Sequence, residues 1–163
     1  MRRNMRGLAG LWLLAAVLLA PLHASAQVVG DRPADSVIAE AVARARATLP
    51  LFWERLENPA RNEENFAVRL RYATAFGGTE DLWAVDAERE GDSVAATIDG
   101  APRDVPDLAH GQRVKVPLSR LVDWYFFRDG KMHGGQTIRA MLPALPKRER
   151  DKFEAMLAPQ DTR

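Results

Sequence analysis

Three short runs in the middle of the chain alternate apolar with other side chains, and this alternation constrains the fold more than any other feature. A period of two is typical of a β-strand with one face on a core. The apolar positions are Phe66, Val68, Leu70 and Tyr72, then Trp83, Val85 and Ala87, then Val94, Ala96 and Ile98. Because only short loops separate the runs, we predict an antiparallel meander.

Residues 110–118 and 136–142 extend this sheet on the same grounds. Their alternating apolar positions are Val114, Val116 and Leu118 in the first segment, and Ile138, Ala140 and Leu142 in the second. Between them, Ser119 is a candidate N-cap for a short helical turn that carries Leu121 and Val122. The two segments therefore predict two further strands.

The stretch DWYFFRDGKMHGG (123–135) predicts a β-hairpin. Asp129-Gly130 is a strong signal for a two-residue turn, because both central residues of such a turn take positive φ. Alternation along the preceding strand places Tyr125 and Phe127 on one face, and Trp124 and Phe126 on the other. One of these pairs should meet the core, and the other is a candidate surface for a partner.

Helical spacing occurs at both ends of this β-rich region. From Asp35 or Ser36, both suitable N-caps, apolar or small residues recur every three or four positions to Leu56. Pro50 lies inside this stretch, so we expect a kink or a short break there. Residues 147–157 predict a modest terminal helix with Phe153, Met156 and Leu157 on its apolar side.

The order of these elements predicts an α+β fold, because the helices do not alternate strictly with the strands. We expect an N-terminal helix packed on a curled antiparallel sheet of about five or six strands, followed by a short C-terminal helix. Closure of the sheet into a small barrel is an open alternative at this point.

The first 26 residues have the three parts of a secretory signal peptide: a basic start, an apolar run, and small residues that end at Ala26. Cleavage after Ala26 predicts an exported protein, periplasmic in a double-membraned bacterium, with no stable membrane insertion after cleavage. An uncleaved anchor is the weaker alternative, because Pro21 and His23 interrupt the apolar run.

Cleavage would leave a flexible leader over residues 27–34 and a single domain over residues 35–158. It would also remove three arginines and change the formal net charge from +1 to −2. A near-neutral surface of mixed sign lacks the basic footprint of a nucleic-acid-binding protein. The absence of cysteine excludes a disulfide framework and thiol catalysis, so the core alone must stabilise the domain.

Histidine is scarce in the predicted mature chain, where only His110 and His133 remain, without HxH or HExxH spacing. We therefore expect no metal site and no cofactor. The sequence lacks GxSxG, and HGG at 133–135 has no nucleophile elbow, so no catalytic residue is assigned. The glycine pairs at 77–78 and 134–135 do not continue into a phosphate-binding loop and are interpreted as turns.

Six residues are candidates for binding a ligand or a partner: Glu80, Trp83, Asp123, Trp124, Arg128 and His133. Asp123 is singled out because an acid beside a buried aromatic residue needs a hydrogen-bond partner. With no catalytic signature, the chain is interpreted as a non-enzymatic domain that binds another protein or a small ligand.

Two other hypotheses stay open at this point. The first is a small hydrolase-like enzyme that uses His133 with Asp123 or Glu80. The second, an immunity-type inhibitor of a secreted toxin, is itself a binding function. The observation that would best distinguish an enzyme from a binding domain is a single pocket shared by Glu80, Asp123 and His133.

Four segments carry a family resemblance: ATLPLFWERL (47–56), GGTEDLWAVD (77–86), GQRVKVPLSRLVDW (111–124) and RDGKMHGGQTIRAML (128–142). In combination they resemble the bacterial domain of unknown function 2314, the family of YegJ-like proteins. The resemblance covers nearly the whole predicted mature chain. It implies a compact domain, found alone behind a signal peptide or beside other modules, and it implies no activity or catalytic residue.

Overall fold

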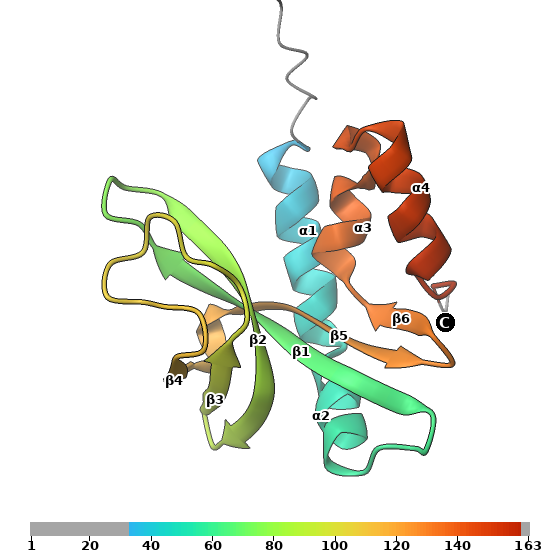
Figure 1. Ribbon diagram of the computed structural model, residues 1–163, viewed down its shortest axis with the longest axis horizontal. Coiled ribbons are helices and arrows are strands. Elements are labelled where there is room, and N and C mark those ends of the chain that lie inside the picture. The colour runs from blue at the N-terminus through green and yellow to red at the C-terminus, as the bar shows by residue number, and fades with distance from the viewer. Residues whose placement is uncertain (1–32, 161–163) are drawn as a thin grey trace, which may run out of the picture.

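The computed structural model describes residues 33–160, which form an α+β domain (Figure 1). The helices are α1 (Asp35–Ala47), α2 (Leu49–Glu57), α3 (Gln136–Met141) and α4 (Lys147–Met156). The strands are β1 (Glu63–Ala73), β2 (Thr79–Glu90), β3 (Ser93–Ile98), β4 (Arg113–Pro117), β5 (Leu121–Arg128) and β6 (Lys131–Gly134). The predicted signal peptide and most of the predicted leader lie outside the described residues.

All six strands form one antiparallel sheet in the order β4-β3-β2-β1-β5-β6. The meander predicted from the three alternating runs is confirmed as β1, β2 and β3. The sheet does not close, so the barrel alternative is wrong. The chain after α4 lies against β6 instead: the Ala158 N–H donates to the Met132 carbonyl at 2.9 Å, and Leu157 forms a parallel bridge with Met132.

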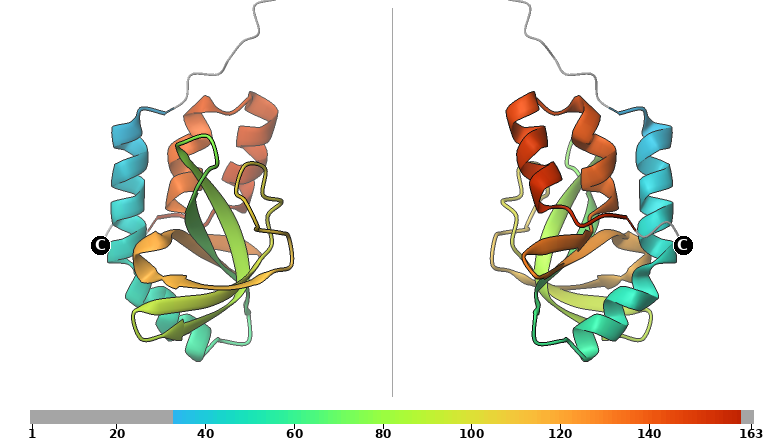
Figure 2. Two further views of the ribbon diagram at one scale, coloured as in Figure 1. Left: turned by 90° about the vertical axis from the view of Figure 1, so that its left-hand side faces the viewer. Right: turned by 90° about the vertical axis from the view of Figure 1, so that its right-hand side faces the viewer.

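Bulges give the sheet its curl. The register shifts between Glu64 and Ala67 and again between Val85 and Glu88, and Asp86 in the second bulge takes a positive φ of 51°. A bulge increases the local twist of a strand. The curled sheet packs one face against α1 and α2, which run along one side of the domain (Figure 2).

The core lies between this face and the two N-terminal helices. Its fully buried side chains include Phe52 from α2, Val68 and Leu70 from β1, and Phe126 from β5. The prediction for β5 is confirmed, because Trp124 and Phe126 face the core and Tyr125 and Phe127 face the other side.

The core side assigned to Trp83 and Val85 of β2 was wrong, whereas the assignment of Ala87 to the core is confirmed. Leu82, Ala84 and Ala87 are the core residues of this strand, so Trp83 lies on the opposite face. There its ring contacts the Tyr125 ring edge-on, with the ring centres 4.7 Å apart. The bulge after Val85 then moves Ala87 back to the core side. A shift of one residue exchanges the two faces of a strand, and the sequence did not reveal the bulge.

The hairpin turn at Asp129-Gly130 is confirmed, since the two residues have φ values of 51° and 71°. The break near Pro50 is also confirmed: α1 ends at Ala47, and Pro50 lies in the first turn of α2. Neither Asp35 nor Ser36 is the N-cap of α1. The helix starts after Ala34 with no side-chain cap, and Asp35 lies in its first turn, where a negative charge is favourable.

Three details of the second half differ from the predictions. Ser119 lies in a 3₁₀ turn (Leu118–Arg120) that has no side-chain cap, and Leu121 and Val122 belong to β5. Residues 136–142 are not a strand, because α3 occupies them and a second 3₁₀ turn follows. No residue within α4 is buried, whereas Leu157, just after its last residue, is buried and forms a bridge with Met132 of β6.

Candidate functional site

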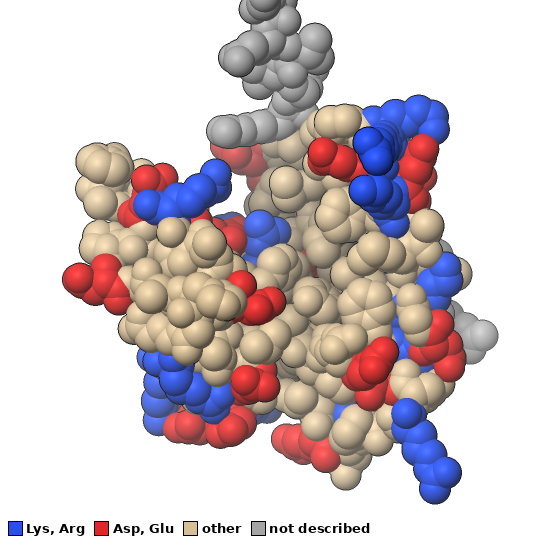
Figure 3. Space-filling model, in the orientation of Figure 1, with Lys and Arg blue, Asp and Glu red and all other residues tan. Residues whose placement is uncertain are grey.

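A groove opens between the tip of the β1–β2 hairpin and the helices α1 and α3. Figure 3 shows this hollow, with basic and acidic atoms in it. Its volume is about 490 Å³, and its charged lining residues are Asp35, Arg69, Glu80, Asp81, Arg103 and Asp104. Three threonines and the apolar residues Pro33, Ile38 and Met141 complete the walls. The groove is therefore a site of mixed charge with apolar patches in its walls.

Glu80 fixes one wall of this groove. Its carboxylate accepts hydrogen bonds from the backbone N–H groups of Arg103 at 3.2 Å and Asp104 at 3.1 Å, and it pairs with the Arg103 guanidinium at 3.5 Å. The N–H of Asp104 and the contacts with Arg103 hold the pKa of Glu80 below its ordinary value, against the effect of burial. Glu80 thus stays ionised and ties the 103–104 loop to β2.

Asp81 is held in a similar way. Its two carboxylate oxygens accept from Nε and Nη2 of Arg71 at 2.7 and 2.8 Å. The two residues are directly opposite each other on β1 and β2. Such a bidentate pair has a fixed geometry, so the position of Asp81 in the groove is set before any ligand arrives.

Arg69 lies at the side of the groove where β1 meets α3. Its Nη1 donates to the Thr137 hydroxyl at 2.8 Å, and its guanidinium carbon lies 5.6 Å from the centre of the Trp83 ring. Within residues 33–160, Arg71 and Arg103 pair with carboxylates, whereas Arg69 forms no such ion pair. Arg69 is therefore the groove cation whose charge is least compensated.

Asp123 lies behind Thr137 and is completely buried. Its carboxylate accepts hydrogen bonds from the N–H groups of Trp124 (2.9 Å), Gln136 (3.1 Å) and Thr137 (2.7 Å), and from the Thr137 hydroxyl (2.6 Å). Burial raises the pKa of Asp123, and these four hydrogen bonds oppose that effect. From strand β5, Asp123 thus accepts hydrogen bonds from amides in the first turn of helix α3. Its role is to position that helix.

His133 belongs to a different part of the surface. It stacks on Phe126, its cross-strand partner, with ring centres 5.2 Å apart and an interplanar angle of 6°. It lines a second cavity of about 330 Å³ together with Trp124, Arg44 and Arg139. The structure therefore does not bring Glu80 and His133 into one pocket, and Asp123 lines neither cavity.

The remaining sequence candidates are dispersed. Trp83 supports Arg69 from the outer face of the sheet. Trp124 is a core residue whose indole N–H donates to the Ala45 carbonyl at 2.8 Å, and Arg128 pairs with Glu63 at the far end of β1. Sequence reasoning missed Arg69 and Thr137. The only signal for Arg69 was its place on the outward face of an alternating strand, and Thr137 was assigned to a strand.

Comparison with known proteins decides the family. A family model described as an uncharacterized protein conserved in bacteria, DUF2314, matches residues 35–158. The chain belongs to the DUF2314 family. The resemblance seen in four sequence segments is thereby confirmed.

Two curated relatives support this assignment. The uncharacterized protein YegJ of Escherichia coli K12 is 29% identical over 120 residues, which cover 74% of this chain and 76% of YegJ. A putative ankyrin repeat protein of Neisseria meningitidis serogroup B is 29% identical over 132 residues, which cover 75% of this chain and 51% of that protein. The chain thus spans about half the length of the second relative. No solved structure matches significantly.

Within the part of this DUF2314 domain that the structure describes, no group of three or more His, Cys, Asp or Glu side chains could hold a metal ion. In the same residues, no helix has the length and apolar character needed to cross a membrane.

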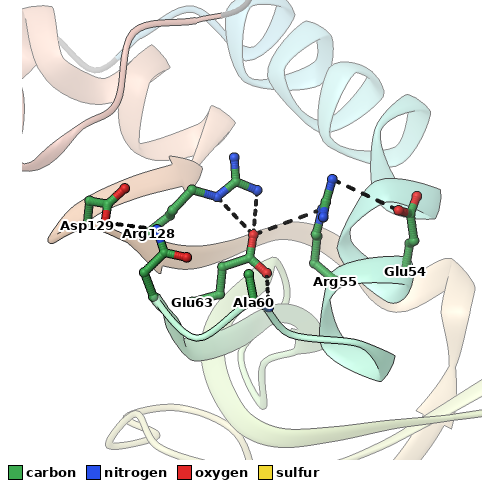
Figure 4. Close-up of polar contacts among 7 residues, drawn as sticks. Glu54, Arg55, Ala60, Glu63, Arg128 and Asp129 are labelled. Atoms are coloured by element: carbon green, nitrogen blue, oxygen red, sulfur yellow. Dashed lines mark hydrogen bonds and ion pairs between the residues drawn. The ribbon is translucent and has the colours of Figure 1, made fainter.

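A second charged cluster in the DUF2314 domain has a structural role (Figure 4). The buried Glu63 carboxylate accepts from the Ala60 N–H at 2.8 Å and from Nε and Nη2 of Arg128, and Arg55 lies 4.0 Å away. Burial acts to raise the pKa of Glu63, but the Ala60 amide and the two arginines together hold it below its ordinary value. The cluster joins the turn after α2 to the β5–β6 hairpin.

We expect Glu63→Gln to reduce the free energy of unfolding by about 1–3 kcal/mol at neutral pH, because a charged hydrogen-bonded partner is lost. A carboxylate with a lowered folded-state pKa stabilises above its unfolded pKa of about 4.3 and loses that contribution as the pH falls through the folded value. The difference between parent and variant in urea unfolding should therefore shrink toward low pH. Glu54→Gln, on the exposed side of Arg55, is the control and should show no such trend. A pH-independent difference would contradict the role given to Glu63.

Proposed function

We propose that this DUF2314 protein is an exported, non-enzymatic binding domain, and that the groove between the β1–β2 tip and helices α1 and α3 is its recognition site. The observation that supports this most directly is that hydrogen bonds within the domain already hold the lining side chains of the groove in position. Glu80 and Asp81 are held by the loop and strand beside them, and Thr137 is held by Asp123. A preformed concave site binds without a large ordering cost.

The same contacts disfavour the hydrolase hypothesis. A general acid or base must reach a substrate proton within about 2.6–3.2 Å, directly or through one water. The Glu80 carboxylate is engaged by two backbone amides, and Asp123 is sealed below the surface. His133 lines another cavity. His133 therefore shares a cavity with neither of its two hypothetical partners, Glu80 and Asp123.

Export is supported by the basic start, the apolar run and the small residues that end at Ala26. In a double-membraned bacterium, a domain exported in this way would reside in the periplasm. The groove carries charges of both signs with an excess of acidic residues, which suits a partner with a complementary excess of basic groups. Basic polypeptides have this property, and an immunity-type inhibitor would be one example of such a binding protein.

Nuclear magnetic resonance can test the site on the mature protein purified from the periplasm, whose intact mass should correspond to a start at Gln27. The isotope-labelled protein is titrated with periplasmic extract of the producing bacterium, separated by dialysis into small-molecule and protein fractions. We expect one fraction to shift the backbone amides of Thr74, Thr79 and Met141. Ala87, which lines a separate cleft beside α2, is the internal control.

Two results would contradict the proposal. One is the absence of groove shifts with both fractions. The other is turnover of acyl or phosphoryl esters by the purified protein that disappears in His133→Ala, which would establish the hydrolase hypothesis instead.

A further inference from the structure

Phe76 stands at the tip of the β1–β2 hairpin with 90% of its surface exposed. In the described part of the chain, the other large apolar residues with marked exposure are far better covered; Leu51 and Val37, for example, are 42% and 41% exposed. Partial exposure of that degree is ordinary on a protein surface. A phenylalanine with 90% of its surface exposed is different, because packing within residues 33–160 does not account for its position.

The loop that carries Phe76 is held in place by hydrogen bonds. The Thr74 N–H donates to the Gly78 carbonyl at 3.2 Å, and the Thr74 hydroxyl donates to the Gly77 carbonyl at 2.6 Å. The Ala75 N–H donates to the Asp104 carbonyl at 2.9 Å, which joins the loop to the one that Glu80 holds. The framework presents Phe76 outward, so binding through its ring would have a low ordering cost.

The surroundings of Phe76 indicate the chemistry of its partner. Thr74 lines the groove, so the loop stands at the groove rim, and Met141, 37% exposed, lies in the same lining. Acidic residues outnumber basic ones in this lining by four to two. A complementary surface would combine an apolar pocket with lysine or arginine around it.

We propose that Phe76 is the aromatic anchor of a protein interface and inserts into an apolar pocket, rimmed by basic residues, on a different protein. This rests on the proposed function and names the partner of the same site. Aromatic side chains that fill pockets at the centre of an interface carry much of its binding energy.

The charges favour this partner over two other classes. A second copy would bring together two grooves that each have four acidic and two basic lining residues, and this shared excess of negative charge opposes such an interface. A membrane with anionic lipids would meet the same acidic lining, whereas peripheral membrane binding by a single apolar residue usually needs basic residues around it.

The test starts in the producing bacterium, with the photoreactive residue benzoylphenylalanine at position 76 of the full-length protein. A matched chain carries it at position 51, which is exposed on α2. The protein crosslinked from position 76 is identified by mass spectrometry and purified. Its affinity is then measured for the parent, Phe76→Ser and Leu51→Ser. Thermal unfolding of both variants should match the parent, since neither side chain is buried.

We expect Phe76→Ser to weaken binding by about 30-fold or more and Leu51→Ser by less than about twofold, as an interface hot spot requires. Added salt should weaken binding of the parent, because the charges are complementary. Three results would each overturn the inference. The first is crosslinking only to a second copy or to lipid, and the second is the absence of any crosslinked product. The third is equal affinity of Phe76→Ser and the parent for the crosslinked protein. If the small-molecule fraction still shifts the groove amides, the proposed function survives and the role of Phe76 alone fails.

Discussion

Replacing Gly134 with alanine should cost at least about 4 kcal/mol of stability or prevent folding, which places it among the most damaging single substitutions. A Cβ at this position would lie 2.3 Å from the Trp124 carbonyl oxygen and 2.6 Å from its indole ring. The indole cannot move away easily, because it packs between Phe52 and Phe126 and donates to the Ala45 carbonyl. The backbone of Gly134 also has a φ of +83°.

Gly130→Ala is the matched control. Its φ of +71° imposes a similar conformational strain, but no atom lies within 4 Å of the added Cβ. We expect a loss of about 1–2 kcal/mol there, from the backbone alone. Urea unfolding of the two variants separates the steric clash from the effect of φ. Equal losses for Gly130→Ala and Gly134→Ala would show that the close approach to Trp124 is not what requires glycine.

Asp123→Ala should reduce the free energy of unfolding by about 3–5 kcal/mol, because one substitution leaves several buried donors without an acceptor. Three of these donors are backbone amides, two of them in the first turn of α3. Hydrogen exchange at Gln136 and Thr137 should rise more than exchange in β1. Chemical unfolding of the whole domain gives the free energy, and the exchange data give its location.

Asp151→Ala serves as the comparison, since Asp151 is an exposed residue of α4 whose partner is Lys147. The loss of such a surface ion pair should cost less than about 1 kcal/mol. If Asp123→Ala were no more harmful than Asp151→Ala, the carboxylate would not be what holds α3 in place, and the wall of the groove would depend on packing alone.

The sequence predicted those parts of the fold that depend on neighbours along the chain. Alternation at Val68 and Leu70 located β1, and Asp129-Gly130 located a turn because its residue types favour positive φ. The two faces of β5 followed from the same period. Pro50 marked the break between α1 and α2 because a proline removes one amide from the helix.

The parts that failed depend on contacts between distant segments. Three alternating apolar residues suggested a strand over 136–142, but the carboxylate that satisfies the first amides of α3 comes from Asp123 on β5. The groove itself was not predictable, because Arg69 contributes to it only when α3 is placed beside β1. Glu80 was selected from the sequence and does line the groove, whereas His133 was selected with it and does not.

The capping of α3 by Asp123 also constrains the order in which the domain assembles. A helix of six residues is far too short to persist in water by itself, because helix nucleation is unfavourable and few hydrogen bonds follow it. Strand β5 must therefore pair with β1 and bring Asp123 into position before α3 is stable. In refolding experiments, the amides of Gln136 and Thr137 should acquire protection after those of β1 and β5. The proposed recognition surface would then be incomplete in partly folded chains, so a partner could distinguish the native domain from its folding intermediates.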